Sequence, residues 1–465
     1  MLSLPCQDDR ILLGISDDTR QISKDWLYVC RKVKGQTKKR LIQEALNKGA
    51  VVLCDHEQKR EHVYVCQEVE HVIQVLIDLY YGLMCEQLQI IGVTGTNGKT
   101  SVSSYIYQLM NMSGKRFMRI GTKEVCYLNQ KDLIPNTTPD CFQLAILFQK
   151  ALTLGLDGIV MEVSSHAIDA NRICFVTFDI VIYTNITQDH LDYHLTKTHY
   201  RFTKFKLRKY VKDTGCVIYN NDLPEMKEFP LLYQGKRITI GSQAHFSIRD
   251  IKLSACDAEF SIQGYSFHTN LLGMINIYNV ASVIAAARIL RLSYELLQTL
   301  TPKLIGVAGR MEVYTFHGIH VWIDYAHTPD ALATLLQFAS SVKTGRVISV
   351  VGCGGNRDQK KRALMADVAA EYSDTAIFTA DNPRYERIDH ILMDMLSQRH
   401  SNVEVYENRY FAIKHAILIA QNSDIIVVAG KGDESILSVQ GRDYPFSDRE
   451  VIRFFIQDEE ENNWN

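Results

Sequence analysis

A glycine-rich segment, Gly92–Thr100, carries the residue types that bind a polyphosphate. It reads Gly-Val-Thr-Gly-Thr-Asn-Gly-Lys-Thr and lies between an apolar run and a helical pattern. Glycines let backbone N–H groups face a phosphate at a helix N-terminus. Lys99 would then reach the terminal phosphates, and Thr100 would offer its hydroxyl group to a magnesium ion. Val93 stands where the strict P-loop pattern has its first glycine. The alternative is a glycine-rich turn with an incidental lysine.

Two further polar groups follow predicted strands. Glu162 ends the apolar run Gly158–Glu162, and an acidic residue at a strand end beside a phosphate loop is a usual magnesium ligand. A buried structural glutamate is the alternative. His190 and His194 are four residues apart with His199 near, a spacing that can bind zinc on a helix. Zinc is the weaker interpretation because no glutamate follows His190 and no cysteine partner is present.

Two helical patterns contain polar residues that also have ordinary structural roles. The stretch Thr198–Val211 contains Lys204 and Lys206 among other basic residues, which by itself indicates a solvated basic helix. An alanine-rich helix is expected from Gly273 to Leu290. Asn276 lies near its start, where an N-cap is the simplest role for an asparagine.

The last third of the chain alternates apolar strands with helices, the pattern of a doubly wound sheet. The expected strands are His320–Asp324, Arg346–Val351, Thr375–Ala380 and Asp424–Ala429. The polar loops that follow them are Asp324–His327, Gly352–Asp358, Asp381–Arg384 and Gly430–Glu434. Ligands of such sheets lie at the carboxyl ends of the strands, so these loops predict a site. The glycines of the second loop lack the spacing of a dinucleotide fingerprint, which excludes a dehydrogenase.

Length and periodicity predict an α/β protein of three domains. A chain of 465 residues exceeds one ordinary core. We expect a small α/β N-terminal domain at 1–85, a central P-loop ATPase-like domain with a mostly parallel sheet at 86–310, and a C-terminal Rossmann-like doubly wound domain at 311–465. In the first domain we expect strands at Trp26–Cys30 and Val51–Cys54, and a helix at Lys39–Lys48 that ends at Gly49. A second helix there should bury one face, made of Val72, Ile73, Leu76, Leu79, Tyr80 and Leu83.

Composition narrows the function classes. The net charge of −2 gives no global reason to expect nucleic acid or a membrane surface. Eleven cysteines without a C-x-x-C pair indicate reduced thiols in a cytosolic protein. The start of the chain lacks the basic and apolar regions of a signal peptide. No apolar run approaches the roughly 20 residues that a membrane helix needs. The expectation is a cytoplasmic enzyme.

Seven polar motifs in this order resemble the Mur ligases, the ATP-dependent amide-bond enzymes of peptidoglycan precursor synthesis. The motifs are Gly95–Thr100, Asn136–Pro139, Glu162–His166, Thr184–His194, Gly309–Glu312, Asp324–Asp330 and Asp381–Arg384. The likeness covers nearly the whole chain and is closest to the members that add the third peptide residue. It implies that ATP phosphorylates the D-glutamate carboxylate of UDP-N-acetylmuramoyl-L-Ala-D-Glu (UDP-MurNAc-L-Ala-D-Glu), and that an incoming amine attacks the acyl phosphate.

The resemblance implies a role for each matching residue. Lys99 would bind phosphate together with the loop Gly95, Thr96, Asn97 and Gly98, while Thr100, Glu162 and His190 would hold Mg²⁺. Counting along the motif places the family's carbamylated lysine at Lys204 and not at Lys206. Asn276 would contact adenine, Asp324 the ribose and Arg310 the γ-phosphate of ATP. Thr19 takes the place of a serine that contacts uridine. The residues that match contacts to the muramoyl dipeptide are Asn136, Thr137, Thr138, Ser164 and Arg172.

The resemblance also bears on which amino acid is added. Asp381-Asn382-Pro383-Arg384 is similar to the version in members that add meso-diaminopimelate, whereas lysine-adding members usually lack the arginine. An arginine fork pairs bidentately with the second carboxylate of diaminopimelate. Arg357, Asn382, Gly430 and Glu434 match the other contacts, and Glu434 suits the distal ammonium group.

Two departures from the family pattern keep alternatives open. Asp433 stands where the family usually has histidine, and the first domain lacks the longer loop expected after Val33–Gly35. The alternatives are a ligase that adds L-lysine or another amine, and a nucleotide-binding partner protein without ligase activity. A monomer is expected.

Overall fold

The computed structural model describes residues 11–31, 35–55, 60–82, 85–187, 190–397 and 400–462. These residues fold into two compact units, one of residues 1–240 with 285–287 and one of residues 241–284 with 288–465. The predicted boundaries near residues 85 and 310 stay a prediction. The prediction on the chain start falls on residues 1–10, outside the described residues. The prediction of a shortened loop after Val33–Gly35 begins in residues 32–34, which are also outside them, and α1 starts at Gly35.

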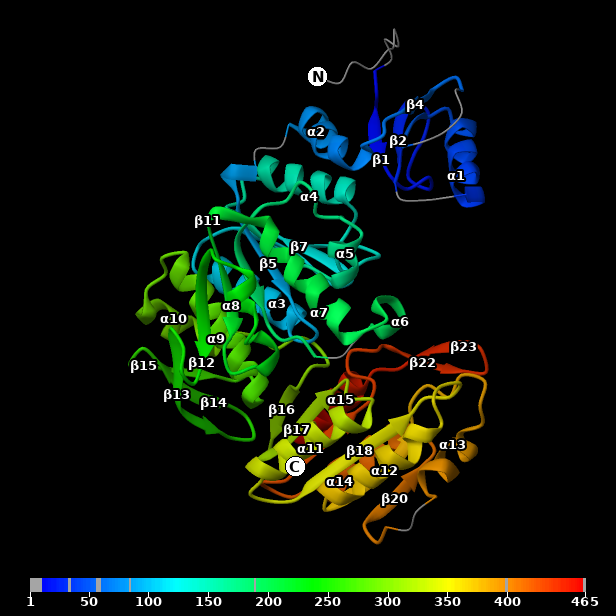
Figure 1. Ribbon diagram of the computed structural model, residues 1–465. Coiled ribbons are helices and arrows are strands. Elements are labelled where there is room, and N and C mark those ends of the chain that lie inside the picture. The colour runs from blue at the N-terminus through cyan, green and yellow to red at the C-terminus, as the bar shows by residue number, and fades with distance from the viewer. Residues whose placement is uncertain are drawn as a thin grey trace. The chain divides into compact units, whose positions relative to one another are not determined.

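The first unit begins with a small parallel sheet in the order β1-β2-β3-β4. Its strands are β1 (Gly14–Ser16), β2 (Trp26–Cys30), β3 (Val51–Cys54) and β4 (Val63–Val65). Helix α1 (Gly35–Asn47) packs against β2 and β3 (Figure 1). Gly49 follows this helix with φ 75°, the left-handed conformation that suits a residue after a helix end. The two predicted strands and the predicted helix are confirmed.

The two faces of this small sheet are buried in different cores. Tyr28 and Val52 belong to the cluster under α1, whereas Leu27 and Leu53 belong to a large cluster that includes Phe142 of the next sheet's covering helix. Successive side chains of a strand point to opposite faces, so both faces of the small sheet carry apolar residues. The first sheet is therefore packed onto the rest of its unit by a shared core.

Helix α2 (Val69–Tyr81) is where the predicted buried face is partly wrong. Leu79 is 78% exposed and Tyr80 is 40% exposed, while Leu83 lies outside the described residues. The buried positions are Val69, Val72, Ile73, Ile77 and Tyr81. Two residues advance a helix by more than half a turn, so a stripe centred on Ile77 leaves Leu79 on the opposite side.

The second sheet of the first unit positions the phosphate loop. The strands that this unit contributes to it have the order β8-β7-β6-β9-β5-β10-β11-β12. The strands are β5 (Gln89–Thr94), β6 (Phe117–Ile120), β7 (Glu124–Tyr127), β8 (Gln130–Leu133), β9 (Gly158–Glu162), β10 (Phe178–Tyr183), β11 (Val211–Asn220) and β12 (Lys236–Gly241). β5 pairs in parallel with both β9 and β10. The ends of these strands, and the polar residues after them, therefore meet at one edge.

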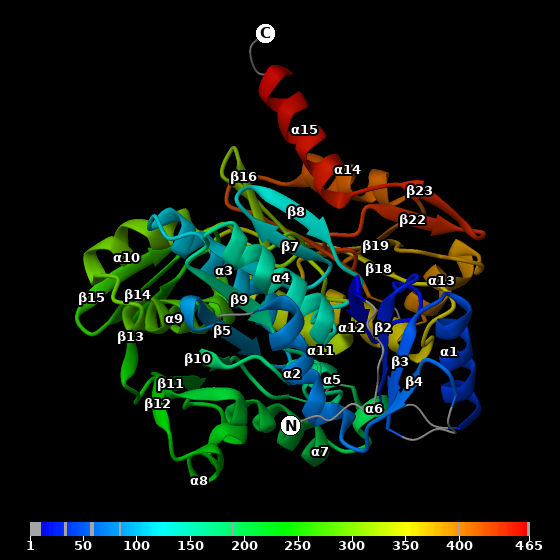
Figure 2. The ribbon, with the colours of Figure 1, turned by 90° about the horizontal axis from the view of Figure 1, so that it is seen from above.

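The remaining helices of this unit lie in the connections after the strands of the second sheet. They are α3 (Lys99–Met112), α4 (Cys141–Thr153), α5 (Ser165–Asp169), α6 (Leu191–His194), α7 (Lys197–Phe205) and α8 (Phe229–Leu232), with a 3₁₀ turn at Lys206–Tyr210. α3 buries Val102, Ile106 and Leu109 as predicted. α3 packs on β6 and β9. It follows β5 directly after the phosphate loop (Figure 2), so its N-terminus lies at the carboxyl edge of the sheet.

The second unit opens with an antiparallel run of β13 (Phe246–Leu253), β14 (Ala258–Ile262) and β15 (Tyr265–Thr269), followed by α9 (Gly273–Ile289) and α10 (Tyr294–Leu300). Asn276 does not have the alternative role of N-cap of α9. The helix begins at Gly273, and the Asn276 Nδ2 group donates to the carbonyl of Leu272 at 2.9 Å. Asn276 thus lies inside the first turn, with its amide turned back along the helix.

The second unit continues as a doubly wound sheet in the order β16-β17-β21-β18-β19-β20. The strands are β16 (Glu312–Phe316), β17 (Ile319–Asp324), β18 (Val347–Cys353), β19 (Thr375–Ala380), β20 (Val403–Tyr406) and β21 (Ile425–Ala429). One core joins the sheet to α11 (Pro329–Val342), α12 (Lys360–Tyr372) and α13 (Ile388–Met395), and another joins it to α14 (Arg409–Ile419) and α15 (Asp448–Asn462). Helices therefore cover both faces, which confirms the predicted Rossmann-like fold.

A two-stranded hairpin of β22 (Ile436–Val439) and β23 (Arg442–Pro445) follows β21. Among the described helices, none combines the length and apolar character needed to cross a membrane. The α/β fold class with three sheet-containing regions is confirmed.

Candidate active site

Close backbone packing shapes the phosphate loop. Gly95 has φ 156°, and a Cβ atom there would lie 1.9 Å from Thr184 Oγ1. The backbone of Asn185 accepts the N–H of Thr96 at 2.9 Å, and its side chain accepts the N–H of Asn97 at 2.9 Å. Gly98, with φ 81°, precedes α3. Contacts from the loop after β10 thus fix the conformation of the phosphate loop at the N-terminus of α3, where backbone N–H groups can bind a phosphate.

Two lysine ammonium groups converge on one carbonyl of this loop. Lys99 Nζ donates to the Gly95 carbonyl at 2.8 Å, and Lys204 Nζ donates to the same oxygen at 2.8 Å. Lys204 is 1% exposed. Lys206 instead has a side chain 49% exposed and pairs with Asp169 at 3.6 Å. The structure therefore places Lys204, and not Lys206, beside the phosphate loop, while the modification of Lys204 remains a prediction.

Glu162 lies fully buried at the end of β9 beside Thr100. Its Oε2 accepts from Thr100 Oγ1 at 3.0 Å and from Thr122 Oγ1 at 3.1 Å, while Oε1 accepts the Thr122 N–H at 3.0 Å. The guanidinium group of Arg119 lies 4.0 Å from Oε1. A carboxylate with a threonine hydroxyl is the hard oxygen donor set that suits Mg²⁺, which also keeps several non-protein ligands.

The histidine stretch forms a cluster of rings. The exposed His190 lies with its ring centroid 4.9 Å from that of His166. His194 is buried, and its Nε2 lies 3.0 Å from Ser165 Oγ. Burial, with His166 and His199 nearby, lowers the pKa of His194. Within the described residues, no three His, Cys, Asp or Glu side chains gather as a metal-binding group. The structure thus joins Thr100 to Glu162, while the metal role of His190 stays a prediction.

A cavity of about 590 Å³ in the first unit contains three predicted substrate contacts: Thr19, Asn136 and Arg172. Beyond them, Arg172 Nη1 donates to the Thr138 carbonyl at 3.0 Å, and Thr138 Oγ1 donates to the Glu162 carbonyl at 2.9 Å. These contacts connect the cavity wall to the Glu162 backbone.

The remaining two predicted contacts in this region join the same polar chain. Ser164 N–H donates to Thr138 Oγ1 at 3.1 Å, and Thr137 Oγ1 lies 3.2 Å from Thr122 Oγ1. Thr122 in turn binds Glu162. A polar path therefore leads from the cavity to the predicted magnesium ligands.

Sequence reasoning missed the buried arginine of this cavity, Arg31. Its guanidinium group donates to Asp17 Oδ2 at 3.3 Å, to the Asn171 carbonyl at 3.1 Å and to Cys141 Sγ at 3.2 Å. Burial, and then the neighbouring Asp140, raise the pKa of Asp17 to about 6, although Arg31 opposes the shift. Arg31 thus ties the first sheet to the segments around α4 and α5.

The predicted ATP contacts of the second unit, Asp324, Arg310 and Asn276, differ from one another in burial and in hydrogen-bond partners. Asp324 Oδ2 accepts the Met311 N–H and Oδ1 accepts the Ala326 N–H, both at 2.8 Å. Burial raises the pKa of Asp324. Arg310 is exposed, with its guanidinium carbon 5.3 Å from the Tyr325 ring centroid. Asn276 is 8% exposed. Their contacts to ATP remain predictions.

The four predicted loops of the second unit meet at the carboxyl edge of its sheet. Gly430 N–H donates to the Asp324 carbonyl at 3.1 Å, and Gly355 N–H donates to the Asn382 carbonyl at 2.9 Å. Asn382 Nδ2 donates to Glu434 Oε2 at 2.7 Å. The convergence of loops from β17, β18, β19 and β21 is therefore confirmed.

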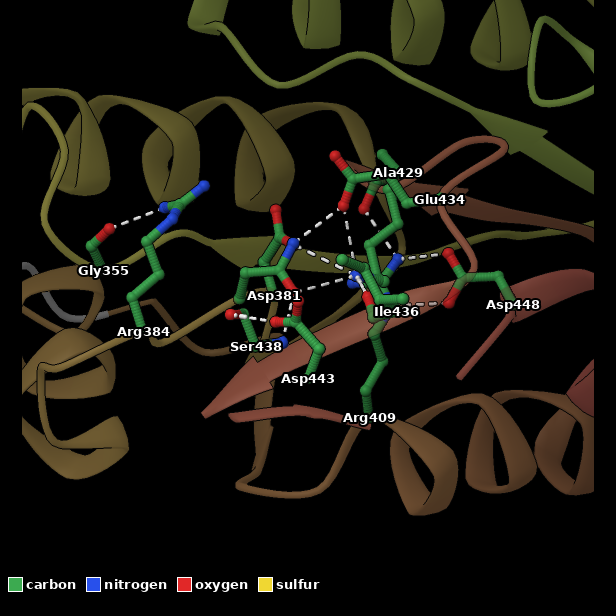
Figure 3. A network of polar contacts seen from close by, with 12 residues as sticks. Gly355, Asp381, Arg384, Arg409, Ala429, Glu434, Ile436, Ser438, Asp443 and Asp448 are labelled. Atoms are coloured by element: carbon green, nitrogen blue, oxygen red, sulfur yellow. Dashed lines mark hydrogen bonds and ion pairs between the residues drawn. The ribbon is translucent and has the colours of Figure 1, made fainter. Parts of the chain in front are cut away.

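Arg384 is held within this set of loops (Figure 3). It has φ 53°, and its Nη1 donates to the Gly355 carbonyl at 2.7 Å. Arg357 is exposed on the same loop as Gly355. Under both loops, the buried Arg362 donates to Glu386 at 2.8 Å and to Asp394 at 2.7 Å. Arg384 is thus linked to Glu434 through Gly355 and Asn382, so the same set of loops carries a guanidinium group and a carboxylate.

Comparison with known proteins identifies the family. Residues 93–287 match the Mur ligase middle domain, and residues 309–432 match the Mur ligase glutamate ligase domain. The UDP-N-acetylmuramoyl-L-alanyl-D-glutamate–2,6-diaminopimelate ligase of Bacillus cereus is 33% identical over 458 residues, covering 95% of this chain and 93% of the relative. The chain belongs to the Mur ligase family.

Other matches agree. The ligase of the same name from Aquifex aeolicus is 35% identical over 451 residues, covering 95% of this Mur ligase and 92% of the relative. A solved structure of an enzyme with that name has a TM-score of 0.79 at 29% identity and covers 98% of both chains. The MurF ligase of Thermotoga maritima, solved in complex with ADP, has a TM-score of 0.62 at 17% identity, which shows the shared fold. This Mur ligase is an ATP-dependent enzyme that joins an acid to an amino acid.

Several residues of this Mur ligase were beyond sequence reasoning. Thr122 and Arg119 approach Glu162 from β6 and the turn after it. Neither stands in a recognisable motif, and only the pairing of β6 with β9 reveals them. Lys431 did carry a signal, because a lysine between two glycines follows a buried strand.

Proposed function

We propose that this Mur ligase joins meso-diaminopimelate to the D-glutamate of UDP-MurNAc-L-Ala-D-Glu, with ATP, in peptidoglycan precursor synthesis. The observation that carries the proposal is the meeting of Arg384, Asn382 and Glu434 in one network of loops. The printed names of the relatives from Bacillus cereus and Aquifex aeolicus describe the same reaction.

The first step is phosphoryl transfer to a carboxylate. A D-glutamate oxygen attacks the γ-phosphorus of ATP, the bond to the β,γ-bridging oxygen breaks, and ADP leaves. Both reactants are anions, so charge neutralisation matters more than proton transfer. Lys99 and the loop Gly95–Thr100 supply it, with Arg310 as the proposed contact to the γ-phosphate. Mg²⁺, with Thr100, Glu162 and His190 as its proposed protein ligands, supplies further positive charge when bound.

The second step is amide formation. The unprotonated amine of diaminopimelate attacks the acyl carbon, and the tetrahedral intermediate loses inorganic phosphate. The products are one amide, ADP and HPO4²⁻, which carries the proton lost by the amine nitrogen; counted from the ammonium form of diaminopimelate, one proton is also released. We propose that Asn276 and Asp324 hold the adenosine part of ATP, and that Thr19, Asn136, Thr137, Thr138, Ser164 and Arg172 hold the UDP-linked dipeptide.

We also propose that Lys204 is carbamylated. As an unmodified ammonium group it shares the Gly95 carbonyl with Lys99, so two cations face one acceptor. Carbamylation turns Lys204 into an anion that would attract Lys99 and Mg²⁺. The burial of Lys204 keeps this group away from bulk water.

Selection of the amine rests on the second unit. Arg384 and Arg357 can bind the distal carboxylate of diaminopimelate, while Glu434 can bind an ammonium group. L-Lysine lacks that carboxylate and would leave Arg384 without its partner, which costs binding energy. Lysine remains the second candidate because Asp433 adds negative charge to the same loop. A cytoplasmic location and a monomeric state also stay predictions.

The test is ATP-dependent phosphate release with UDP-MurNAc-L-Ala-D-Glu and each amine in turn. Release that requires the UDP substrate, and is at least about 100-fold more efficient with diaminopimelate than with lysine, supports the proposal. Equal efficiency with both amines would remove the selectivity argument. No release with any amine would favour a nucleotide-binding protein without ligase activity.

A further inference from the structure

A fully buried lysine, Lys431, lies under the amino-acid loops. It follows β21, between Gly430 and Gly432, and is 0% exposed. Its Nζ donates to Asn382 Oδ1 at 3.2 Å, to Glu434 Oε2 at 3.3 Å and to the Ile436 carbonyl at 2.6 Å. Figure 3 labels two of these acceptors, Glu434 and Ile436. An ammonium group has three N–H donors, so these acceptors use its full capacity. Lys431 therefore has one defined position.

Lys431 decides which way the Asn382 amide points. Asn382 Oδ1 accepts from Lys431 and also from the Ser438 N–H at 2.9 Å. Both partners can only donate, so the amide oxygen must face them. The NH₂ group is then directed to Glu434 Oε2, where it donates at 2.7 Å. The orientation of Asn382 is thus fixed by a cation and a backbone N–H.

Glu434 is held from one side only. Its Oε2 accepts from both Asn382 and Lys431, yet its side chain is 32% exposed. Lys431 itself is fully buried beneath the loop, so it holds Glu434 without being exposed to a substrate. The Glu434 carboxylate is therefore held in place through Oε2, and the side chain is still exposed enough to contact a substrate.

Lys431 lies in a cluster of buried charged groups. Asp381 Oδ1 lies 3.7 Å from Lys431 Nζ. Arg409 binds Asp448 through two bonds of 2.7 Å, with both side chains 0% exposed, and also donates to the Ala429 carbonyl. Lys431 and Arg409 thus place two buried cations among the carboxyl groups of Asp381, Glu434 and Asp448. Burial raises the pKa of Asp381.

We propose that Lys431 is a positioning residue for the amino-acid substrate: it orients Asn382 and Glu434 so that their loops bind the ammonium group of diaminopimelate. This rests on the proposed function of the same loops. Lys431 acts through Asn382 and Glu434, and it does not contact the substrate. Its loss should weaken binding of the amine without affecting phosphoryl transfer.

The test compares Lys431→Met with a matched control in the full chain. Loss of hydrogen bonds from a charged group should raise the KM for diaminopimelate about 10- to 100-fold in phosphate release. The KM for ATP should stay within about twofold, because Lys431 Nζ donates to Asn382, Glu434 and Ile436 and to none of the residues proposed to bind ATP. Lys343→Met is the control. Lys343 pairs with Asp374 at 2.6 Å, and it precedes the first residue of β18, at the end of the strand opposite to the amino-acid loops. An unchanged KM for diaminopimelate would overturn the proposal.

A double-mutant cycle separates positioning from mere support of the fold. If Lys431 acts through Glu434, the variant Lys431→Met/Glu434→Gln should bind diaminopimelate no more than about threefold more weakly than Glu434→Gln. The proposal would be contradicted if the fold-changes in the KM for diaminopimelate caused by Lys431→Met and by Glu434→Gln multiplied in the double variant. Lys431→Arg, which keeps the cation, should recover part of the affinity. If Lys431→Met does not fold, the same cycle is measured with Lys431→Arg. Its effect on the KM for diaminopimelate should again largely disappear when Glu434 is already replaced by glutamine.

The wild-type enzyme distinguishes the two proposals. If it releases no phosphate with diaminopimelate, the proposed function fails whatever the variants do. If it uses diaminopimelate and Lys431→Met has the same KM for it, only the positioning role of Lys431 fails.

Discussion

The phosphate loop and the amino-acid loops both lie at the carboxyl ends of parallel strands, but different forces hold them. Backbone hydrogen bonds and tight glycine packing define the phosphate loop, within Gly95–Lys99 and the neighbouring Asn185. The amino-acid loops depend on side chains from distant segments, such as Lys431 and Arg362. The phosphate loop can therefore be recognised from a short sequence motif, whereas the amino-acid loops take their form only when distant segments come together in the folded chain.

This difference predicts which substitutions damage which property. Changes in the phosphate loop should reduce the rate of chemistry while the fold persists. Changes among the buried charges of the second unit should reduce stability or amine affinity instead. Three substitutions test this contrast and a fourth tests a buried carboxyl group elsewhere in the first unit, and they follow from the largest expected effect to the smallest.

Replacing Lys204 by alanine should nearly abolish activity. It removes the group proposed to carry the carbamate, and loss of a placed electrostatic group costs about 1,000-fold in kcat. Small carboxylates such as acetate should restore part of the rate by filling the space. Phosphate release measures both effects. Lys206→Ala is the control, because Lys206 is half exposed and pairs with Asp169, and its activity should stay near that of the wild type.

Two results would break this part of the comparison. Full activity of Lys204→Ala without added carboxylate would rule out a role for a carbamate. An equal loss in Lys206→Ala would show that the basic stretch acts as a whole.

Replacing Arg409 by methionine should destabilise the second unit. Arg409 and Asp448 are both 0% exposed, and removal of one partner leaves a buried charge, at a cost of about 3–5 kcal/mol in unfolding free energy. Denaturant unfolding measures it. Arg387→Met is the matched control, since the Arg387 and Asp389 side chains are 70% and 40% exposed and exposed pairs contribute less than about 1 kcal/mol. Similar losses in both variants would contradict the role assigned to burial.

Replacing Arg384 by alanine should affect the amine alone. We expect the KM for diaminopimelate to rise about 10- to 100-fold, as for loss of a charge-assisted hydrogen bond, with little change for lysine. Steady-state phosphate release with each amine measures it. Arg442→Ala, on the exposed strand β23, is the control. An unchanged KM for diaminopimelate would move amine selection away from the loop Asp381–Arg384.

Replacing Asp17 by asparagine should stabilise the protein at high pH. Burial raises the pKa of Asp17 from 3.8 to about 6, so the folded state binds more protons than the unfolded state between these values. Stability is then lost as pH rises through this window. An asparagine side chain cannot ionise, so the variant should gain about 1–2 kcal/mol at pH 8, reduced by a weaker contact to Arg31, and nothing below about pH 4. Denaturant unfolding at both pH values measures the difference. A variant less stable than the wild type at pH 8 would show that the Arg31 pair dominates.

The same contrast explains what the sequence could predict. Lys99, Glu162 and the four loops of the last sheet were predictable because strand ends and short motifs are local features. The wrong face of α2 shows the limit of periodicity: Leu79 is apolar but points away from the core. Asn276 shows a second limit, because an N-cap depends on the exact first residue of the helix.

The residues that were missed share one property. Arg31, Arg119 and Lys431 find their partners in segments distant along the chain or brought together by sheet pairing. A buried cation is identified by its acceptors, and those acceptors are placed by tertiary structure. Sequence reasoning could note Lys431 between its glycines, but not what it holds.

The central claim is that the phosphate loop activates the D-glutamate carboxylate and that the loops around Arg384 choose the amine. One measurement tests both: UDP-MurNAc-L-Ala-D-Glu with ¹⁸O in the D-glutamate carboxylate is incubated with ATP and equal concentrations of diaminopimelate and lysine, and products are analysed by mass spectrometry. We predict one ¹⁸O atom in the released phosphate and a product that contains diaminopimelate almost exclusively. Unlabelled phosphate, or equal amounts of the two products, would contradict the claim.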